Sequence, residues 1–256
     1  MKYAKPPQSG FCCYITPVNY LFLFASPILH FILLLPLMFL VRGNYRSRDL
    51  LTFFYILLVL IAESVIAERL DLPFFPGQQW NWIGKGACFV IALLVIISGK
   101  PIAKARAGWT THLDKSFYKV LVPVSIILLL MRFMLKVYFN QFHKFDFETI
   151  LFQATMPGLS EELIYRGLLL GLFNKLYSAT YIKKRMWVSW PAVWVSILFA
   201  LAHGFRLDEG MHLHFSFQSL CMTFAVGLVL AWLRQRSGSL WPSIVFHNLW
   251  NLIVLS

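Results

Sequence analysis

The chain has 256 residues, of which 59% are hydrophobic and 13% are charged, whereas ordinary globular proteins have about 45–50% and about 25%. This composition, with a mean hydropathy of +0.66, argues against a soluble globular protein. The net charge of +12 comes from Lys and Arg residues that lie between apolar runs and not in one stripe or tail, which argues against a nucleic-acid binder.

Eight apolar runs predict eight membrane-spanning helices, because such a helix takes about 20 apolar residues. We expect the spans, in chain order, at residues 20–41, 50–67, 82–98, 120–138, 149–173, 187–203, 217–233 and 240–254. No internal repeat and no flexible linker divides the chain. The sequence therefore predicts an all-α fold: one membrane domain over residues 1–256, a polytopic transmembrane bundle of about eight helices.

Cationic residues predict the orientation of this bundle. The loops after the first, third, fifth and seventh spans are rich in Lys and Arg, whereas the other loops hold fewer cations and most of the acids. Because Lys and Arg concentrate on the cytoplasmic side, we expect both termini to face away from the cytoplasm.

Ionisable residues inside the predicted spans are candidate functional groups, because each costs about 2.5–3.5 kcal/mol at the centre of a membrane helix. The densest group is Glu161, Glu162 and Arg166. Glu162 and Arg166 are four residues apart with the acid first, which favours a helical ion pair that acts as a structural clamp. Glu161 lies about 100° around the helix and is expected to have no cation of its own, as suits a general base.

Pro157 and Gly158 precede this group and are expected to break the helix. Ser160 would then be the N-cap of a new helical segment. Both carboxylates would therefore lie in the first turn of that segment.

Two later spans add polar groups. His203 ends an apolar helix and shares a face with Phe199, a position that on its own is more typical of a cap or interface residue. His247 and Asn251 are four residues apart, so their side chains point the same way. They can donate hydrogen bonds to one developing oxyanion or, equally well, hold two spans together.

His212 and His214 lie in a loop and alternate as on an extended chain. They could contact a metal ion, but the acidic residues beside them favour a solvated loop. The complementary groups are therefore Glu161, His203, His247 and Asn251, which would line a polar catalytic cavity inside the membrane. A carboxylate and an imidazole can deprotonate one water, and a second imidazole with an amide can stabilise the oxyanion that forms.

The chain resembles the CPBP family of intramembrane proteases, which includes type II CAAX prenyl endopeptidases and bacteriocin-processing or self-immunity proteins. Each motif of the resemblance lies in its own late span, in the order Glu161-Glu162-x-x-x-Arg166, Phe199-x-x-x-His203 and His247-x-x-x-Asn251. One such motif is weak, but the three together are specific. The resemblance covers residues 149–254, the expected CPBP-like catalytic core.

The resemblance implies a membrane-embedded endopeptidase that acts on a peptide or a lipidated protein. Glu161 and His203 would activate water, His247 and Asn251 would form the oxyanion site, and Glu162 with Arg166 would shape the cavity. Zinc could also be held by Glu161, His203 and His247, with a water as the fourth ligand. Because Asn251 is a poor zinc ligand and one glutamate cannot easily be both ligand and base, we expect a metal-free mechanism that requires no cofactor.

The expected location is the bacterial cytoplasmic membrane, with the lipid bilayer and the substrate as partners and no nucleic acid. By the loop charges, His203 ends its span on the non-cytoplasmic side, whereas an enzyme that trims prenylated proteins would open to the cytosol. Either that orientation is wrong or the substrate is exported, translocating or lipid-borne.

Other protein classes fit less well. A rhomboid-like protease would need a Gly after the serine of Gly158-Leu159-Ser160, where this chain has Glu161. Zincins need an HExxH motif, which the sequence lacks. A transporter would carry broken helices in both halves, whereas the intramembrane charges are expected to cluster in the second half. The remaining alternative is a non-catalytic membrane scaffold or bacteriocin-immunity protein that binds a partner in the same cavity.

Overall fold

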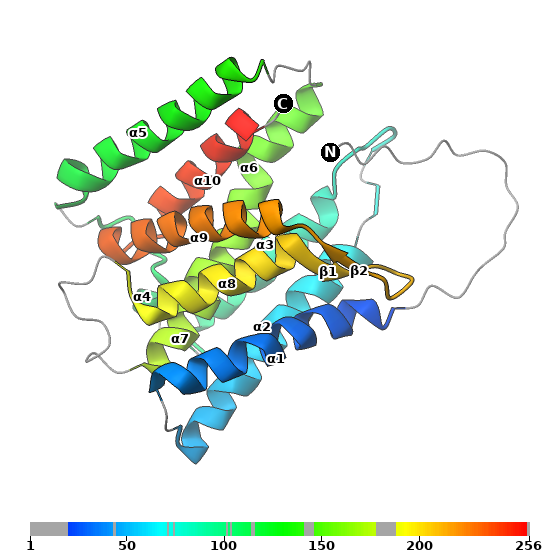
Figure 1. Cartoon of the computed structure of the whole chain (residues 1–256), viewed down its shortest axis with the longest axis vertical. Helices are drawn as coiled ribbons and strands as arrows, with labels where there is room; N and C mark the ends of the chain where they lie inside the picture. Colours follow the sequence, from blue (N-terminus) through cyan, green and yellow to red (C-terminus); the bar gives the residue numbers. More distant parts are fainter. Residues whose placement is uncertain are drawn as a thin grey trace, which may run out of the picture.

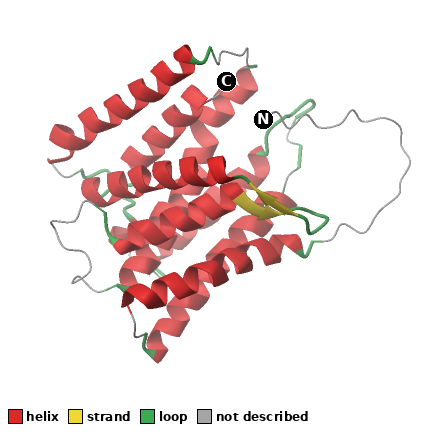
Figure 2. Ribbon diagram, in the orientation of Figure 1, coloured by secondary structure: helices red, strands yellow, loops and turns green. Residues whose placement is uncertain are grey.

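The computed structural model describes residues 20–254 except 43–44, 71, 74, 101, 103, 114–115, 141–145 and 178–187. These residues form a mostly helical bundle, which confirms the predicted fold class (Figures 1 and 2). The long helices are α1 (Phe22–Arg42), α2 (Leu50–Arg69), α3 (Trp82–Ser98), α5 (Ser116–Tyr138), α6 (Phe147–Glu162), α8 (Trp190–Gly204), α9 (Phe217–Ser237) and α10 (Trp241–Val254).

Several short elements were not predicted. A 3₁₀ turn covers Ser47–Asp49 and a single helical turn forms α4 (Lys104–Ala107). A π-helical segment, Leu163–Leu169, continues α6 directly into α7 (Leu170–Leu176). Strands β1 (Phe205–Leu207) and β2 (Leu213–Phe215) form an antiparallel hairpin in which Arg206 pairs with His214.

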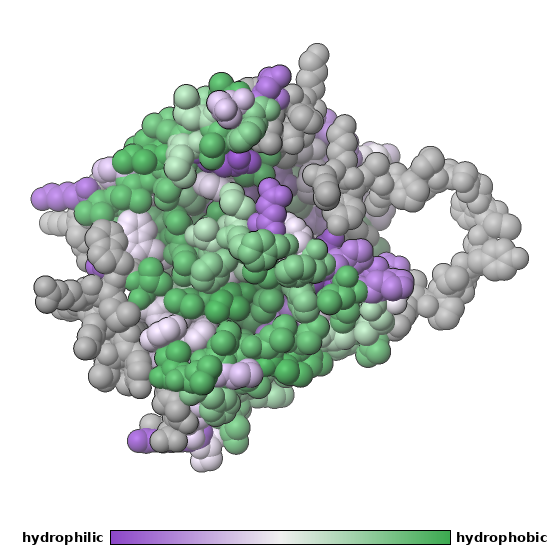
Figure 3. Space-filling model, in the orientation of Figure 1, coloured by the Kyte–Doolittle hydropathy of each residue, from purple (hydrophilic) through white to green (hydrophobic). Residues whose placement is uncertain are grey.

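Among the described residues, four helices are long and apolar enough to cross a membrane, namely α1, α2, the Lys119–Tyr138 part of α5, and α9. The protein is thus a multi-pass membrane protein, although only four of the eight predicted spans meet these criteria. The difference has a physical cause: α3 and α8 have 17 and 15 residues, or about 26 and 23 Å of helix, against a hydrocarbon core of about 30 Å. Apolar side chains cover much of the visible surface (Figure 3), as expected for contact with lipid.

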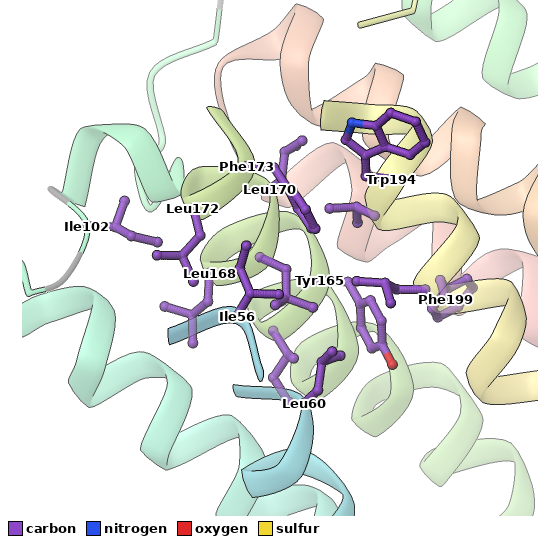
Figure 4. Close-up of a cluster of buried hydrophobic side chains, with 14 of the residues drawn as sticks. Ile56, Leu60, Ile102, Tyr165, Leu168, Leu170, Leu172, Phe173, Trp194 and Phe199 are labelled. Atoms are coloured by element: carbon purple, nitrogen blue, oxygen red, sulfur yellow. The ribbon is translucent and has the colours of Figure 1, made fainter. Parts of the chain in front are cut away.

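The best-buried part of the protein is the π-helical segment with α7. Leu163, Leu169 and Phe173 are completely buried against residues of α2, α3 and α8. In Figure 4, Tyr165 of the π-helical segment points toward Phe199 of α8, and their ring centroids lie 5.1 Å apart. The segment that carries the charged motif is therefore fixed by an apolar core.

The predicted helix break at Pro157 is wrong, because α6 runs through it. The proline removes the backbone donor that would pair with the Gln153 carbonyl. Beside it, Asn248 of α10 bonds to two other backbone groups of α6: Gly158 N–H donates to Asn248 Oδ1 at 2.8 Å, and Asn248 Nδ2 donates to the Thr155 carbonyl at 3.3 Å. Ser160 is not an N-cap, since its hydroxyl donates to the Met156 carbonyl at 2.8 Å inside the helix.

Helix ends are set by their sequences. Asp146 caps α6 by accepting from the Thr149 N–H at 2.8 Å, and Ser189 caps α8 by accepting from the Ala192 N–H at 3.3 Å. Gly238 ends α9 with φ +74°, a conformation that few other residues adopt without strain. These ends fix where α6, α8 and α10 meet.

Candidate active site

Glu162 lies in a fully buried ion pair. Its Oε1 accepts from Arg166 Nη1 at 2.9 Å, so the predicted pair four residues apart is present. Arg166 also donates to the Gly227 carbonyl of α9 at 3.2 Å. Because both side chains are completely buried, this pair links α6 to the neighbouring helices inside the protein.

His247 of α10 also contacts Glu162. Its Nδ1 lies 2.8 Å from Glu162 Oε1. A carboxylate only accepts hydrogen bonds, so Nδ1 carries a proton and donates it. The other ring nitrogen, Nε2, lies 3.9 Å from Oε2 of Glu161.

His203 of α8 approaches Glu161 from another direction. Its Nδ1 donates to the Phe199 carbonyl at 2.8 Å, and its Nε2 lies 3.9 Å from Glu161 Oε2. The Phe199 ring packs on both imidazoles, with centroid distances of 4.5 Å to His203 and 5.9 Å to His247. Phe199 thus holds both histidines, a role that the sequence reasoning did not assign to it.

The structure therefore brings Glu161, His203 and His247 together around one point. Separations of 3.9 Å are too long for direct hydrogen bonds, which span about 2.8 Å, and suit groups that a water would bridge. With both imidazoles neutral, all three facing atoms are acceptors, whereas a water offers two protons. One additional proton on an imidazole Nε2 completes the hydrogen bonding.

Exposure differs across this group. The side chain of His203 is 40% exposed, whereas those of Glu161 and His247 are 12% and 6% exposed. A substrate can therefore reach the group from the side of His203, where α8 ends and the hairpin begins.

The expectation that Glu161 has no cation is wrong. Lys85, in the first turn of α3, places Nζ 2.8 Å from Glu161 Oε1, and its side chain is 22% exposed. Lys85 lies inside the predicted span 82–98. Glu63 of α2 lies near enough to interact electrostatically with both Lys85 and Glu161.

Intramembrane charges therefore do not cluster in the second half alone. The sequence does indicate these charges: Lys85 lies within the apolar run 82–98, and Glu63 lies within the apolar run 50–67.

Asn251 is half-buried one turn after His247 on α10, and its carboxamide makes no hydrogen bond to any other residue that the structure describes. None of the described residues therefore fixes the orientation of this carboxamide. Its neighbour Asn248, which the motif analysis did not single out, instead bonds to α6.

His212 and His214 do not join this group. Both contact Asp208 in the hairpin: His214 Nε2 lies 2.8 Å from Oδ2, and His212 Nδ1 lies 3.3 Å from Oδ1. The hydrogen bond from His214, then that from the His212 backbone N–H, lowers the pKa of Asp208 to about 2. The two exposed histidines therefore stabilise a turn.

Zinc does not fit the observed donor set. Among the described residues, no three His, Cys, Asp or Glu side chains are grouped to hold a metal ion. Glu161, one of the three expected zinc ligands, already pairs with the Lys85 ammonium, whose charge opposes a second cation on the same carboxylate.

The sequence comparison matches the later part of the chain to a family model. Residues 143–253 match the family model described as type II CAAX prenyl endopeptidase Rce1-like, which confirms the resemblance inferred from the motifs. No curated protein and no solved structure matches the chain. Residues 143–253 are thus similar to the Rce1-like type II CAAX prenyl endopeptidases, an intramembrane protease family.

Proposed function

We propose that this protein is an intramembrane endopeptidase that hydrolyses a peptide bond of a membrane-associated or lipidated protein in the bacterial cytoplasmic membrane. Residues 149–254 would be the catalytic core of a single membrane domain. The observation that carries the proposal is the approach of His203 Nε2 and His247 Nε2 to the same oxygen of Glu161, each at 3.9 Å.

The chemistry begins with a water held between Glu161 and His203. Glu161 takes one proton from this water, and the oxygen attacks the carbonyl carbon of the scissile bond. The carbonyl oxygen becomes an oxyanion, which accepts hydrogen bonds from Nε2–H of a protonated His247 and from the Asn251 carboxamide. Glu161 then delivers its proton to the leaving amine as the C–N bond breaks.

Glu162 supports this mechanism through His247. A protonated imidazole carries a positive charge, and the Glu162 carboxylate lies 2.8 Å from its Nδ1. The same hydrogen bond fixes the ring so that Nε2 faces Glu161. Arg166 in turn holds Glu162, so the ion pair acts on the reaction only through the histidine.

The test is cleavage of quenched fluorescent peptides, with and without a C-terminal prenyl cysteine, by purified protein in detergent. Wild type should cleave, Glu161→Gln should lose activity to background, and Glu209→Gln, which alters an exposed hairpin glutamate, should match wild type. A requirement for the prenyl group would identify a lipidated substrate. Cleavage should persist in a chelator; loss that zinc restores would contradict the metal-free mechanism.

A wild type that cleaves no peptide, but binds peptide as well as Glu161→Gln does, would contradict the proposal. The cavity would then serve recognition alone, as in a scaffold or bacteriocin-immunity protein.

A further inference from the structure

We infer that Lys85 is a positioning residue for Glu161, so that the active site includes α3 and extends beyond the family-matched segment 143–253. The inference rests on the proposed function. Lys85 Nζ contacts one oxygen of Glu161, Oε1, at 2.8 Å. The two histidines face the other oxygen, Oε2. Lys85 and the two histidines therefore face different oxygens of the same carboxylate.

The position of Lys85 is costly without this partner. It lies in the first turn of α3, where the positive end of the helix dipole disfavours a cation. Its side chain is only 22% exposed, so it has also lost part of its hydration. A lysine that served only solubility or membrane orientation would point into water.

The start of α3 is tied to the start of α6. Asn81 caps α3 by accepting from the Gly84 N–H at 2.6 Å, and its Nδ2 donates to the Ala67 carbonyl of α2. The Trp82 indole N–H and the Trp80 backbone N–H both donate to Glu148 Oε1 of α6, at 3.0 and 3.2 Å. These bonds fix the first turn of α3 against α6 and thereby hold Lys85 beside Glu161.

Glu161 needs such a partner for its reaction. A free carboxylate rotates about its terminal bond and exchanges its two oxygens. A cation on Oε1 prevents this exchange and leaves Oε2 toward the water site. The same cation favours the ionised carboxylate, which is the form that can accept a proton.

Other ionisable groups also surround Glu161, so the effect of Lys85 must be separated from theirs. They come from every element packed around this part of α6: Glu63 on α2, Cys88 on α3, Glu162 on α6 itself, Tyr165 and Arg166 in the π-helical segment, His203 on α8 and His247 on α10. Lys85 is the group in this set that makes a direct ion pair with Oε1.

The experiment measures kcat and KM of wild type, Lys85→Met, Lys85→Arg and Lys100→Met between pH 5 and 9 with a cleaved peptide. Lys85→Met should lower kcat by about 100-fold, as a small misplacement of a catalytic group does, while KM changes little. The acidic limb of its kcat profile should move about one pH unit higher, because loss of the cation makes Glu161 easier to protonate. Lys85→Arg should return that limb to the wild-type pH at reduced kcat.

Lys100→Met is the matched control, because Lys100 is an exposed lysine just beyond the other end of α3. It should behave as wild type. Lys85→Gln replaces Lys85→Met if the methionine variant does not fold, and the same shift of the acidic limb is expected.

Two results would overturn the inference: wild-type kcat in the neutral variant, or lost activity with an unmoved acidic limb and no rescue by arginine. The second result is what a merely structural lysine would give. A wild type that cleaves nothing would overturn the proposed function itself, whereas cleavage that depends on Glu161 but not on Lys85 would overturn this inference alone.

Discussion

Glu161 and Glu162 are adjacent in sequence, but they lie in two different regions of the site. On the open side, Glu161 meets Lys85 and the exposed edge of His203. On the closed side, Glu162 is completely buried with Arg166 and accepts from His247. One of two identical side chains can thus support the structure while the other takes part in the chemistry, when their surroundings differ in exposure and charge.

The largest expected effect comes from breaking the closed side. Arg166→Met leaves the charge of Glu162 buried without its guanidinium partner, which should lower the free energy of unfolding by about 3–5 kcal/mol. Unfolding in mixed SDS and detergent micelles measures this loss. The double variant Glu162→Gln with Arg166→Met should recover most of the stability, because no charge then remains buried.

Lys85→Met is the matching change on the open side and should cost less stability, because the side chains of Lys85 and Glu161 keep 22% and 12% of their surface exposed whereas those of Glu162 and Arg166 keep none. Equal losses for Arg166→Met and Lys85→Met would show that the two sides do not differ in this way.

Asn251 and Asn248, three residues apart on α10, allow a second comparison between a catalytic and a structural role. Asn251→Ala removes a proposed oxyanion donor and should lower kcat by about 100- to 1,000-fold with little change in stability. Asn248→Ala removes the hydrogen bonds that support α6 at Gly158 and should instead cost about 1 kcal/mol of stability per bond. Peptide cleavage and SDS unfolding of both variants separate the two roles, and a reversed result would exchange them.

The smallest expected effect lies outside both sides, in the hairpin. Asp208 has a folded-state pKa of about 2, below its unfolded value of about 3.9. Its contribution to stability is therefore present above pH 4 and is lost as the pH falls toward 2. Protection of the 205–215 amides from hydrogen exchange, taken relative to the intrinsic rate at each pH, should fall over that range in wild type, and Asp208→Asn should show low protection throughout while cleaving peptide normally at neutral pH.

If protection of these amides in Asp208→Asn fell on acidification as much as in wild type, another group would control the stability of the hairpin.

Local patterns predicted much of the molecule. Apolar runs located the helices, and the four-residue spacing of Glu162 and Arg166 predicted their pair, because both features depend on residues close together in the chain. The approach of His203 and His247 to Glu161 was expected only from the complementary chemistry of the groups and from the family resemblance.

Local patterns did not predict contacts between distant helices. Lys85 and Glu161 are 76 residues apart, and periodicity reports the face of a helix but not its neighbour. Pro157 was expected to break α6 because periodicity does not report the hydrogen bond that Asn248, about 90 residues later, makes to Gly158. The hairpin strands have three residues each, too few for an alternating pattern to be distinguished from a loop.

The π-helical segment Leu163–Leu169 fixes the phase between α6 and α7. A stretch with i to i+5 hydrogen bonds holds about one residue more per turn than an α-helix, so it acts as a one-residue insertion in a continuous rod. Deleting a single residue there would let the helix become regular with nearly the same angle between α6 and α7, whereas deleting one from the regular helix beside it would rotate everything after it by about 100°. A deletion between Glu162 and Arg166 would also shorten the four-residue spacing of their ion pair, so the motif depends on the number of residues in this segment as well as on their identity.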